Sequence, residues 1–414
     1  MSASSDAQPD PSPRRREGPV VGLISGGHFM SHFFVLCLPP LFPILKVEFN
    51  VSYVELGLAM TAYGLLGGFM QAPVGFLVDR LGPRNLLFAG LGLNAGAILM
   101  MGFAQNFEML LVFAVLAGLG NSVFHPADYA ILNGSIHPNR LGRAFSMHTF
   151  SGFFGSACAP VGILALVSYT DWRVALISVG LFGLLIWAIM MLCRSSLQGA
   201  AAPDTADGDV STAPGRTGIR LLLSPPVLLF LGFFIAYGMV TGGLRAFSVT
   251  ALVNLHGLGL DQANAALTGF LFGVVGGILL AGVIVDRYPQ HARIAVVALL
   301  LALVCTIAPI WAGLPGLALI VLLTVVGVGL GAALPPRDLL IRALIPPGET
   351  GKVFGFVFVG FTVGGSIAPP FFGGLLDAGN PSLIFGLSAA FIVLSIAFVI
   401  AAQLTALRQR AKPV

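Results

Sequence analysis

Ionisable side chains are rare in the long apolar stretches of this sequence, and most of them are acid–base groups that could carry protons. They are His28 and His32 in the first stretch, His125 and Asp128 in the fourth, and Asp338 in the tenth. His28 and His32 are four residues apart, so a helix places them on one face. Histidine changes its charge between pH 5 and 8, and an ionisable group in lipid is costly unless it faces a cavity or a partner. We therefore predict that this set couples proton movement to function.

The histidines also have simpler interpretations. A single histidine in a membrane helix is often a hydrogen-bonded packing residue, and His125 could cap the kink that Pro126 causes. The pair on one face of the first stretch is the stronger indication of proton exchange. His148, in the fifth stretch, is the weakest candidate.

Two arginines in apolar stretches indicate the charge of a ligand. The guanidinium groups of Arg245 and Arg337 can bind carboxylate, phosphate or phosphonate oxygens in pairs, so they predict an anionic substrate. The alternatives are that Arg245 extends to the membrane surface and that Arg337 pairs structurally with Asp128 or Asp338. Adjacent residues point in different directions on a helix, so Arg337 and Asp338 need not pair with each other. The aromatic residues predicted to line the same site are Tyr63 and Tyr237.

The composition is that of a chain in lipid. Of 414 residues, 57% are hydrophobic and only 9% are charged, whereas a soluble domain of this size needs far more charge on its surface. The basic residues are scattered between apolar stretches, which excludes a nucleic-acid-binding face. No metal, disulfide or cofactor is predicted, because the four cysteines have neither paired nor metal-ligand spacing. They are Cys37, Cys158, Cys193 and Cys305.

Twelve apolar segments reach the ~20 residues that a helix needs to cross a bilayer. We predict an all-α membrane protein with twelve transmembrane helices in two pseudo-symmetric six-helix bundles, residues 19–194 and 224–405. Residues 195–223 are predicted to be a cytoplasmic linker, 1–18 a disordered cytoplasmic tail and 406–414 a second cytoplasmic tail. The predicted segments are 19–45, 52–78, 84–104, 107–132, 143–168, 172–194, 225–252, 263–285, 291–312, 315–340, 352–376 and 381–405.

The basic residues also predict the orientation. If both tails are cytoplasmic, 17 of the 21 Lys and Arg lie at cytoplasmic helix ends or in the tails, and only Lys46 and Arg173 lie outside. This distribution agrees with the positive-inside rule. We expect an integral protein of a bacterial inner membrane with both termini in the cytoplasm.

The two halves repeat each other at a nearly constant separation. Gly75–Arg80 matches Gly282–Arg287 at an offset of 207, and Pro126–Asp128 matches Pro336–Asp338 at an offset of 210. The second match predicts a broken helix in each half, which is typical of a central binding site. The match of Gly75–Arg80 with Gly282–Arg287 predicts a gate. A segment that only fixed the orientation of the chain in the membrane would need positive charge alone, whereas here the aspartate recurs as well. The residues predicted to form this gate are Gly75, Asp79, Arg80, Gly82, Arg84, Arg143, Gly282, Asp286 and Arg287.

The loop Gly75–Arg84 resembles the cytoplasmic signature of the major facilitator superfamily of secondary transporters. Two positions depart from the pattern of proton-driven members and antiporters: Ala114 stands where many carry an arginine, and Ala159-Pro160 replaces a Gly-Pro motif. Three further stretches are similar to fosmidomycin-resistance-like exporters of that superfamily: Gln71–Gly75, Gly118–Pro126 and Gly152–Pro160.

The resemblance and the buried charges together predict a secondary transporter, not an enzyme. We expect it to move a small anionic organic solute or drug by alternating access, coupled to protons. A carboxylate uptake symporter and a non-transporting sensor with the same fold remain alternatives. No Gly-x-x-x-x-Gly-Lys-[Ser/Thr] phosphate loop occurs, which argues against an ATP-driven pump. The expected partners are the substrate, protons and the lipid bilayer, and the expected state is a monomer.

Overall fold

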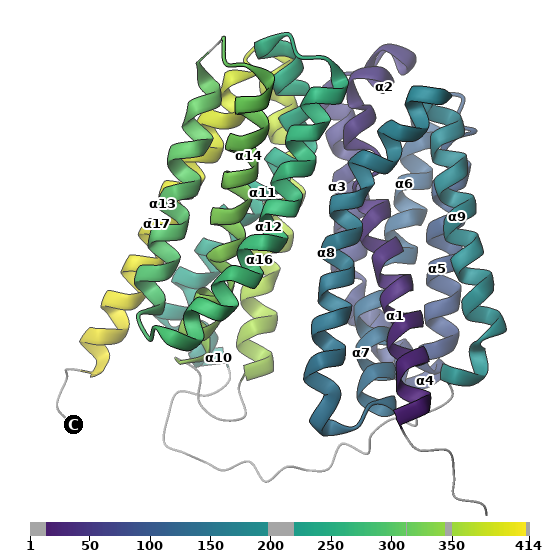
Figure 1. Ribbon diagram of the computed structural model, residues 1–414. Helices are drawn as coiled ribbons and strands as arrows, with labels where there is room; N and C mark the ends of the chain where they lie inside the picture. The colour runs from purple at the N-terminus through teal and green to yellow at the C-terminus, as the bar shows by residue number, and fades with distance from the viewer. Residues whose placement is uncertain (1–13, 198–218, 312, 344–349, 411–414) are drawn as a thin grey trace, which may run out of the picture.

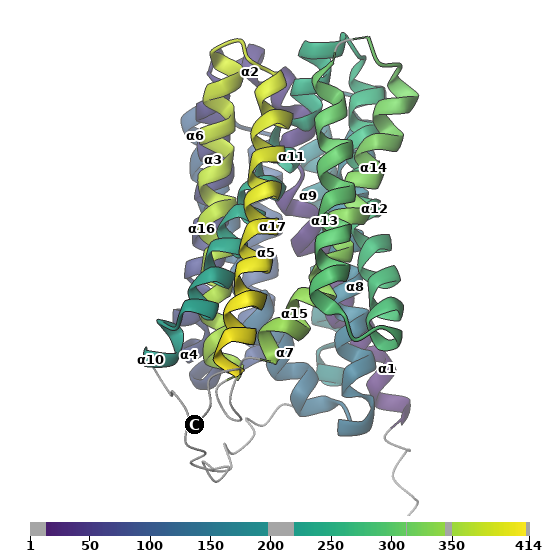
Figure 2. The same cartoon turned by 90° about the vertical axis from the view of Figure 1, so that its left-hand side faces the viewer.

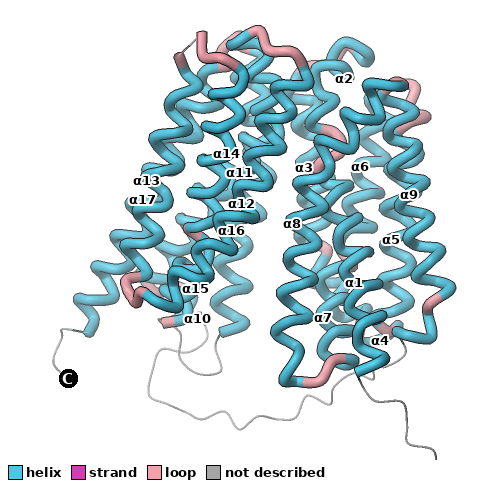
Figure 3. The backbone as a smooth tube through the Cα atoms, in the orientation of Figure 1, coloured by secondary structure: helices cyan, strands magenta, loops and turns pink. Residues whose placement is uncertain are grey.

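The computed structural model describes residues 14–197, 219–311, 313–343 and 350–410, and these ranges contain helices and loops but no strand (Figure 3). Most of the predicted tails and of the predicted linker lie outside the described residues. The helices form two bundles that stand side by side (Figure 1). An all-α fold with two bundles is what the apolar segments predicted.

The N-terminal bundle contains the purple to teal helices of Figure 1, from α1 to α9. Its helices are α1 (Arg14–Val35), α2 (Phe42–Phe49), α3 (Tyr53–Phe69), α4 (Gln71–Leu81), α5 (Pro83–Met101), α6 (Phe107–Asn121), α7 (Phe124–Ser135), α8 (Pro138–Tyr169) and α9 (Trp172–Leu192), with short 3-10 turns η1 (Pro39–Leu41) and η2 (Arg194–Leu197).

The C-terminal bundle contains the green to yellow helices, and Figure 2 shows it with α13 and α17 side by side near the viewer. Its helices are α10 (Ile219–Leu222), α11 (Pro225–His256), α12 (Leu260–Arg287), α13 (His291–Ile307), α14 (Gly316–Ala332), α15 (Leu334–Arg342), α16 (Thr350–Asp377) and α17 (Ser382–Arg410), with the 3-10 turn η3 (Ala308–Ile310).

Eleven helical segments of the described residues are long and apolar enough to cross a membrane. The remaining predicted crossing, 52–78, consists of α3 and α4, which meet at Met70. The Met70 amide donates to Leu66 O at 3.1 Å and the Val74 amide donates to Met70 O at 2.9 Å, so the helical path continues through the junction. Counted this way, the structure agrees with twelve crossings.

Both predicted broken helices are present. In the fourth crossing α6 ends at Asn121 and α7 begins at Phe124, just before Pro126. In the tenth, α14 ends at Ala332 and α15 begins at Leu334, just before the two prolines 335 and 336. Proline has no amide hydrogen and clashes with the preceding turn, so each break lies where the sequence placed it.

Local signals also set where some helices begin. Ser52 and Glu55 form a capping box at the start of α3, with the Glu55 amide donating to Ser52 Oγ at 3.1 Å. Gly82 joins α4 to α5 with φ +83°, a left-handed conformation that favours glycine. This conformation lets the chain turn tightly between α4 and α5, within the loop Gly75–Arg84.

The two bundles contact each other along α3 and α16. The Thr61 hydroxyl donates to Ser366 O at 2.6 Å, and an added Cβ at Gly57 would lie only 2.6 Å from Pro369 O. We call the end of the molecule that carries α2 the far side, and the end where α1 begins and α17 ends the terminal side (Figure 1). The α3–α16 contact runs to the far side, because Asp377 at the end of α16 bonds to the first residues of α3.

Candidate functional site

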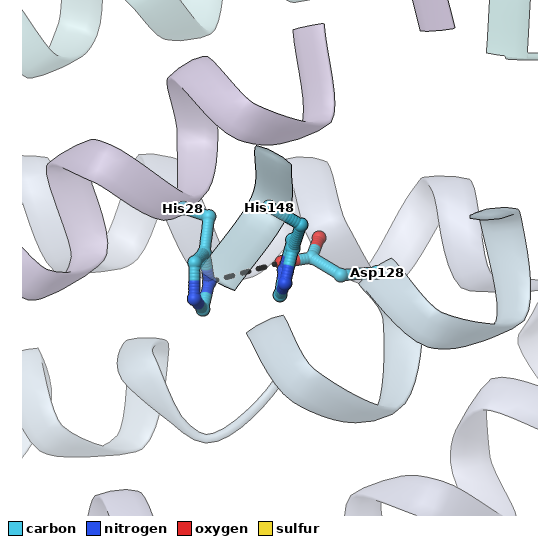
Figure 4. Close-up of side chains that lie close together, drawn as sticks. All are labelled: His28, Asp128 and His148. Atoms are coloured by element: carbon cyan, nitrogen blue, oxygen red, sulfur yellow. Dashed lines mark hydrogen bonds and ion pairs between the residues drawn. The ribbon is translucent and has the colours of Figure 1, made fainter. Parts of the chain in front are cut away.

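A buried carboxylate with two histidine partners lies inside the N-terminal bundle. Asp128 on α7, His28 on α1 and His148 on α8 have at most 2% of their surface exposed. His148 Nε2 lies 2.9 Å and His28 Nδ1 lies 3.3 Å from the same oxygen, Asp128 Oδ2. Figure 4 shows both imidazole rings beside this carboxylate, and the rings are stacked with centroids 3.6 Å apart. The second oxygen, Oδ1, has no hydrogen-bond partner among the described residues.

Two more histidines extend this group, which we call the His–Asp cluster: His28, His32, His125, Asp128 and His148. The ring of His28 lies 4.6 Å from that of His32 and 5.1 Å from that of His125, measured between centroids. His32 Nδ1 is 3.3 Å from the hydroxyl oxygen of Ser156 on α8. The structure therefore joins four of the five predicted acid–base residues, and adds the histidine that the sequence ranked last.

Small residues on α8 bring this group together. An added Cβ at Gly152 would lie 2.7 Å from His28 Nε2, and one at Gly155 would collide with the backbone oxygen of Phe29, so glycine lets α1 approach α8 here. His148 is four residues before Gly152 and thus on the same face of α8. That spacing is the sequence signal that could have found His148.

A cavity of about 840 Å³ lies between the two bundles. Its wall is mainly apolar and aromatic, including Phe34, Phe358 and Phe361. Arg245 is the only charged residue, counting histidine as neutral, among the described residues that line it. The polar side chains of the wall are Tyr63, Gln71, Asn121, His125, Tyr129, Thr241, Arg245, Thr362 and Ser366.

The guanidinium group of Arg245 lines this cavity and has a hydrogen-bond donor without a partner among the described residues. It lies on α11, is half-buried, and its Nε is buried without a hydrogen-bond partner among the described residues. No Asp or Glu belongs to the described lining, so its charge is not balanced at the cavity wall. A half-buried guanidinium with no carboxylate beside it at the wall makes the position favourable for an anion.

The two tyrosines that were also predicted to bind the substrate lie in different surroundings. Tyr63 lines the cavity, and its hydroxyl donates to Asn94 Oδ1 at 3.4 Å. Tyr237 is absent from the described lining, and its hydroxyl donates to Leu330 O at 3.1 Å. Its role in substrate binding stays a prediction.

Arg337 and Asp338 pair with each other, which is one of the structural alternatives given for Arg337. Arg337 Nη2 donates to Asp338 Oδ1 at 2.7 Å and Nε donates to the same oxygen at 3.0 Å. The guanidinium carbon also lies 4.3 Å from the ring centroid of Phe234. The long arginine chain bends back to its neighbour, which backbone direction alone does not forbid. Neither residue is part of the described cavity wall, and their predicted roles in substrate binding and proton coupling stay predictions.

The predicted gate is described only in part. Gly82 makes the turn, Arg80, Arg143 and Arg287 are exposed, and Arg84 is half-buried. Nothing lies within 4 Å of a Cβ added at Gly75 or Gly282. The side chains of Asp79 and Asp286 lie outside the described residues, so the gate stays a prediction.

Comparison with known proteins identifies the family. The model of the Major Facilitator Superfamily matches residues 24–261 and 244–413, which cover most of the chain. The chain belongs to the major facilitator superfamily. This confirms the resemblance drawn from the loop Gly75–Arg84, and with it the expected twelve-helix fold.

Several superfamily proteins are similar over nearly the whole length. The Fosmidomycin resistance protein of Escherichia coli (strain K12) is 24% identical over 380 residues, 89% of each chain. The Multidrug resistance protein MdtH of Salmonella arizonae is 25% identical over 84% of this chain and 83% of its own. A bacterial homolog of the human lysosomal transporter Spinster, solved in an inward-facing and unoccupied conformation, matches with a TM-score of 0.78 at 16% identity, covering 96% of this chain and 99% of that one.

Proposed function

We propose that this superfamily member is a secondary active transporter that moves a small organic anion by alternating access and couples the movement to protons. The observation that carries the proposal is the cavity between the bundles, whose only charged described lining residue is Arg245. Guanidinium recognises carboxylate, phosphate and phosphonate groups through paired hydrogen bonds. The aromatic wall suits the apolar body of such a solute, and about 840 Å³ is enough for a drug-sized molecule.

Protons enter the proposal through the His–Asp cluster. His125 lines the cavity and its ring lies 5.1 Å from His28, which in turn faces Asp128. A proton that arrives from the cavity therefore has a short path to a buried carboxylate. Imidazole groups can take up and release protons near neutral pH, which suits this position.

Alternating access is supported by how the bundles meet. The α3–α16 contact on the far side uses hydrogen bonds and small residues, which can separate without breaking the core of either bundle. The bacterial inner membrane, cytoplasmic termini and a monomeric state remain part of this proposal. The names of relatives such as the Fosmidomycin resistance protein support export of a toxic compound. Uptake of a carboxylate is the alternative direction.

The test is a thermal-shift screen of the purified protein against organic anions, neutral sugars and organic cations. A ligand that binds the folded state raises the unfolding temperature. We expect benzoate, benzenesulfonate or phenylphosphonate to stabilise the wild type and Arg293→Gln, a control on the exposed side of α13. Arg245→Gln should lose this stabilisation. Sugars that stabilise both variants equally, with no effect of anions, would contradict the proposal.

A flux measurement distinguishes a transporter from a non-transporting sensor. Anions that stabilise the protein are reconstituted with it in liposomes, and uptake of the labelled compound is followed. Saturable uptake that Arg245→Gln abolishes supports transport. Binding without any flux in either direction would leave only the sensor interpretation.

A further inference from the structure

The His–Asp cluster holds more nitrogen and oxygen atoms than its hydrogen bonds use. Four of its polar atoms are buried without a hydrogen-bond partner among the described residues: His28 Nδ1, His125 Nδ1, Asp128 Oδ1 and His148 Nδ1. His28 Nδ1 lies 3.3 Å from Asp128 Oδ2 but makes no hydrogen bond with it. Buried polar atoms are nearly always paired with protein, water or an ion, so this concentration of them indicates a binding site.

Three of these side chains place one ligand atom each around a common point. His28 Nδ1, His148 Nε2 and a carboxylate oxygen of Asp128 lie within 4.8 Å of one another, and they come from α1, α8 and α7 (Figure 4). On a tetrahedral ion with bonds of about 2.1 Å, neighbouring ligand atoms are about 3.4 Å apart. The measured distances to Asp128 Oδ2 are 3.3 Å for His28 Nδ1 and 2.9 Å for His148 Nε2. These atoms are therefore close to the spacing that a metal ion needs.

The ring positions show which side chain completes the site and which one must turn. Imidazoles bound to one tetrahedral ion have centroids roughly 5 Å apart, and the centroids of His28 and His125 are 5.1 Å apart. His32 Nδ1 is already bonded to the Ser156 hydroxyl, whereas His125 Nδ1 has no hydrogen-bond partner among the described residues, so His125 is the fourth ligand. The rings of His28 and His148 are stacked with centroids 3.6 Å apart, so His148 must turn out of this stack on binding.

We infer that the His–Asp cluster binds one divalent transition metal ion, with His28, His125, Asp128 and His148 as its ligands. Imidazole suits Zn²⁺, Co²⁺ and Ni²⁺, and one carboxylate completes a common ligand set for such ions. Mg²⁺ and Ca²⁺ need mainly oxygen ligands, which this cluster does not supply. The cluster also supplies no thiolate, the ligand that Cu⁺ prefers.

The cavity between the bundles gives the ion a way in. His125 lines the cavity and is half-buried, whereas Asp128 and His148 have at most 1% of their surface exposed. An ion from the cavity therefore meets His125 first and the other ligands behind it. Ligand nitrogens must be free of protons, so a metal ion and a proton are alternative occupants of the cluster. The inference goes beyond the proposed function, because anion binding at Arg245 does not require it.

The experiment titrates the purified wild type with Zn²⁺, Co²⁺ and Mg²⁺ after treatment with a chelator, using an affinity tag that contains no histidine. We expect one Zn²⁺ bound per chain in calorimetry, a higher unfolding temperature with Zn²⁺, and no effect of Mg²⁺. Co²⁺ reports the geometry, because tetrahedral Co²⁺ absorbs visible light much more strongly than the octahedral aqueous ion. The expected spectrum is that of a tetrahedral site.

Four variants locate the ion. Asp128→Asn, His148→Gln and His125→Gln each weaken or remove one ligand. Each should lower the affinity for Zn²⁺ by at least the roughly 10- to 100-fold that is typical when a residue supporting a ligand is lost. His291→Gln, at the start of α13, is the matched control outside the cluster and should bind Zn²⁺ as the wild type does. If Asp128→Asn or His148→Gln does not fold, the half-buried position of His125 and the wild-type spectrum still decide.

The outcomes are distinct. An octahedral Co²⁺ spectrum, or an affinity for Zn²⁺ that the cluster variants leave unchanged, means adventitious binding elsewhere and overturns the inference. Absence of Zn²⁺ binding also overturns it. Benzoate binding is measured on the same metal-free samples. Stabilisation by benzoate that Arg245→Gln abolishes would support the proposed anion site even where the metal site fails.

Discussion

Asp377 joins the two bundles at the far side of the molecule, and under the proposed alternating access its replacement should favour opening on that side. Its Oδ1 accepts from the Tyr53 amide at 2.9 Å and from Lys46 Nζ at 3.0 Å, and its Oδ2 accepts from the Val54 amide at 3.0 Å. The two amides are the first of α3, where an anion is favoured by the helix dipole. Asp377 ends α16, so one carboxylate joins the two bundles.

The size of the effect follows from these bonds. Asp377→Ala removes two backbone hydrogen bonds worth about 1 kcal/mol each in the far-side-closed state. The Lys46 side chain is 35% exposed, and a surface ion pair of this kind adds little. A loss of about 2 kcal/mol, at 1.4 kcal/mol per factor of ten, shifts the equilibrium about 30-fold toward the far-side-open state.

The assay is a distance measurement between spin labels on the far side. Cysteines are introduced at Gln105, between α5 and α6, and at Asp261 in the first turn of α12, after the four native cysteines are replaced. We expect the wild type to give mainly the short distance and Asp377→Ala to add a longer one. Lys46→Gln is the control, with a change under about threefold. An unchanged distribution in Asp377→Ala, or an equal change in Lys46→Gln, would refute the reasoning.

Three further predictions concern residues away from the cavity. Gly327→Ala places a methyl group against Phe270 O, where α14 packs on α12, and should lower stability by about 1–3 kcal/mol, measured as the unfolding temperature. Asp338→Ala leaves the 4% exposed Arg337 without its carboxylate, so we expect loss of folded protein in size-exclusion chromatography. Tyr237→Phe removes the hydrogen bond to Leu330 O and should lower the free energy of unfolding by about 1 kcal/mol. A loss of anion affinity in the same variant would support the predicted role of this tyrosine in substrate binding, and an unchanged affinity would contradict it.

Sequence patterns predicted those features that depend on neighbouring residues. The breaks before Pro126 and before the two prolines at 335 and 336 follow from the missing amide hydrogen of proline. The segment predicted to begin at residue 52 does so in the structure, where a capping box within four residues fixes the start of α3. Each signal acts within one or two helical turns, so it can be recognised without knowing the rest of the fold.

The partners of the buried charges could not be predicted in the same way. His148 bonds to Asp128 from 20 residues away, while Asp128 also meets His28 from 100 residues earlier in the chain. Which residues meet depends on how far each helix is rotated about its axis. A helix that faces lipid on one side and protein on the other can be apolar all round, so its sequence lacks the polar face that would indicate its rotation.

The sequence by itself determined that this chain crosses a membrane in twelve apolar segments, that its halves are repeats, and that it resembles the major facilitator superfamily. Those properties follow from composition, length and local pattern. Only the tertiary structure decided that Arg245 faces the cavity, that Arg337 is paired with Asp338, and that His148 joins His28 at Asp128. The physical reason is that contacts between helices in lipid depend on close approach at small residues such as Gly152, which fix helix rotations that hydrophobicity leaves free.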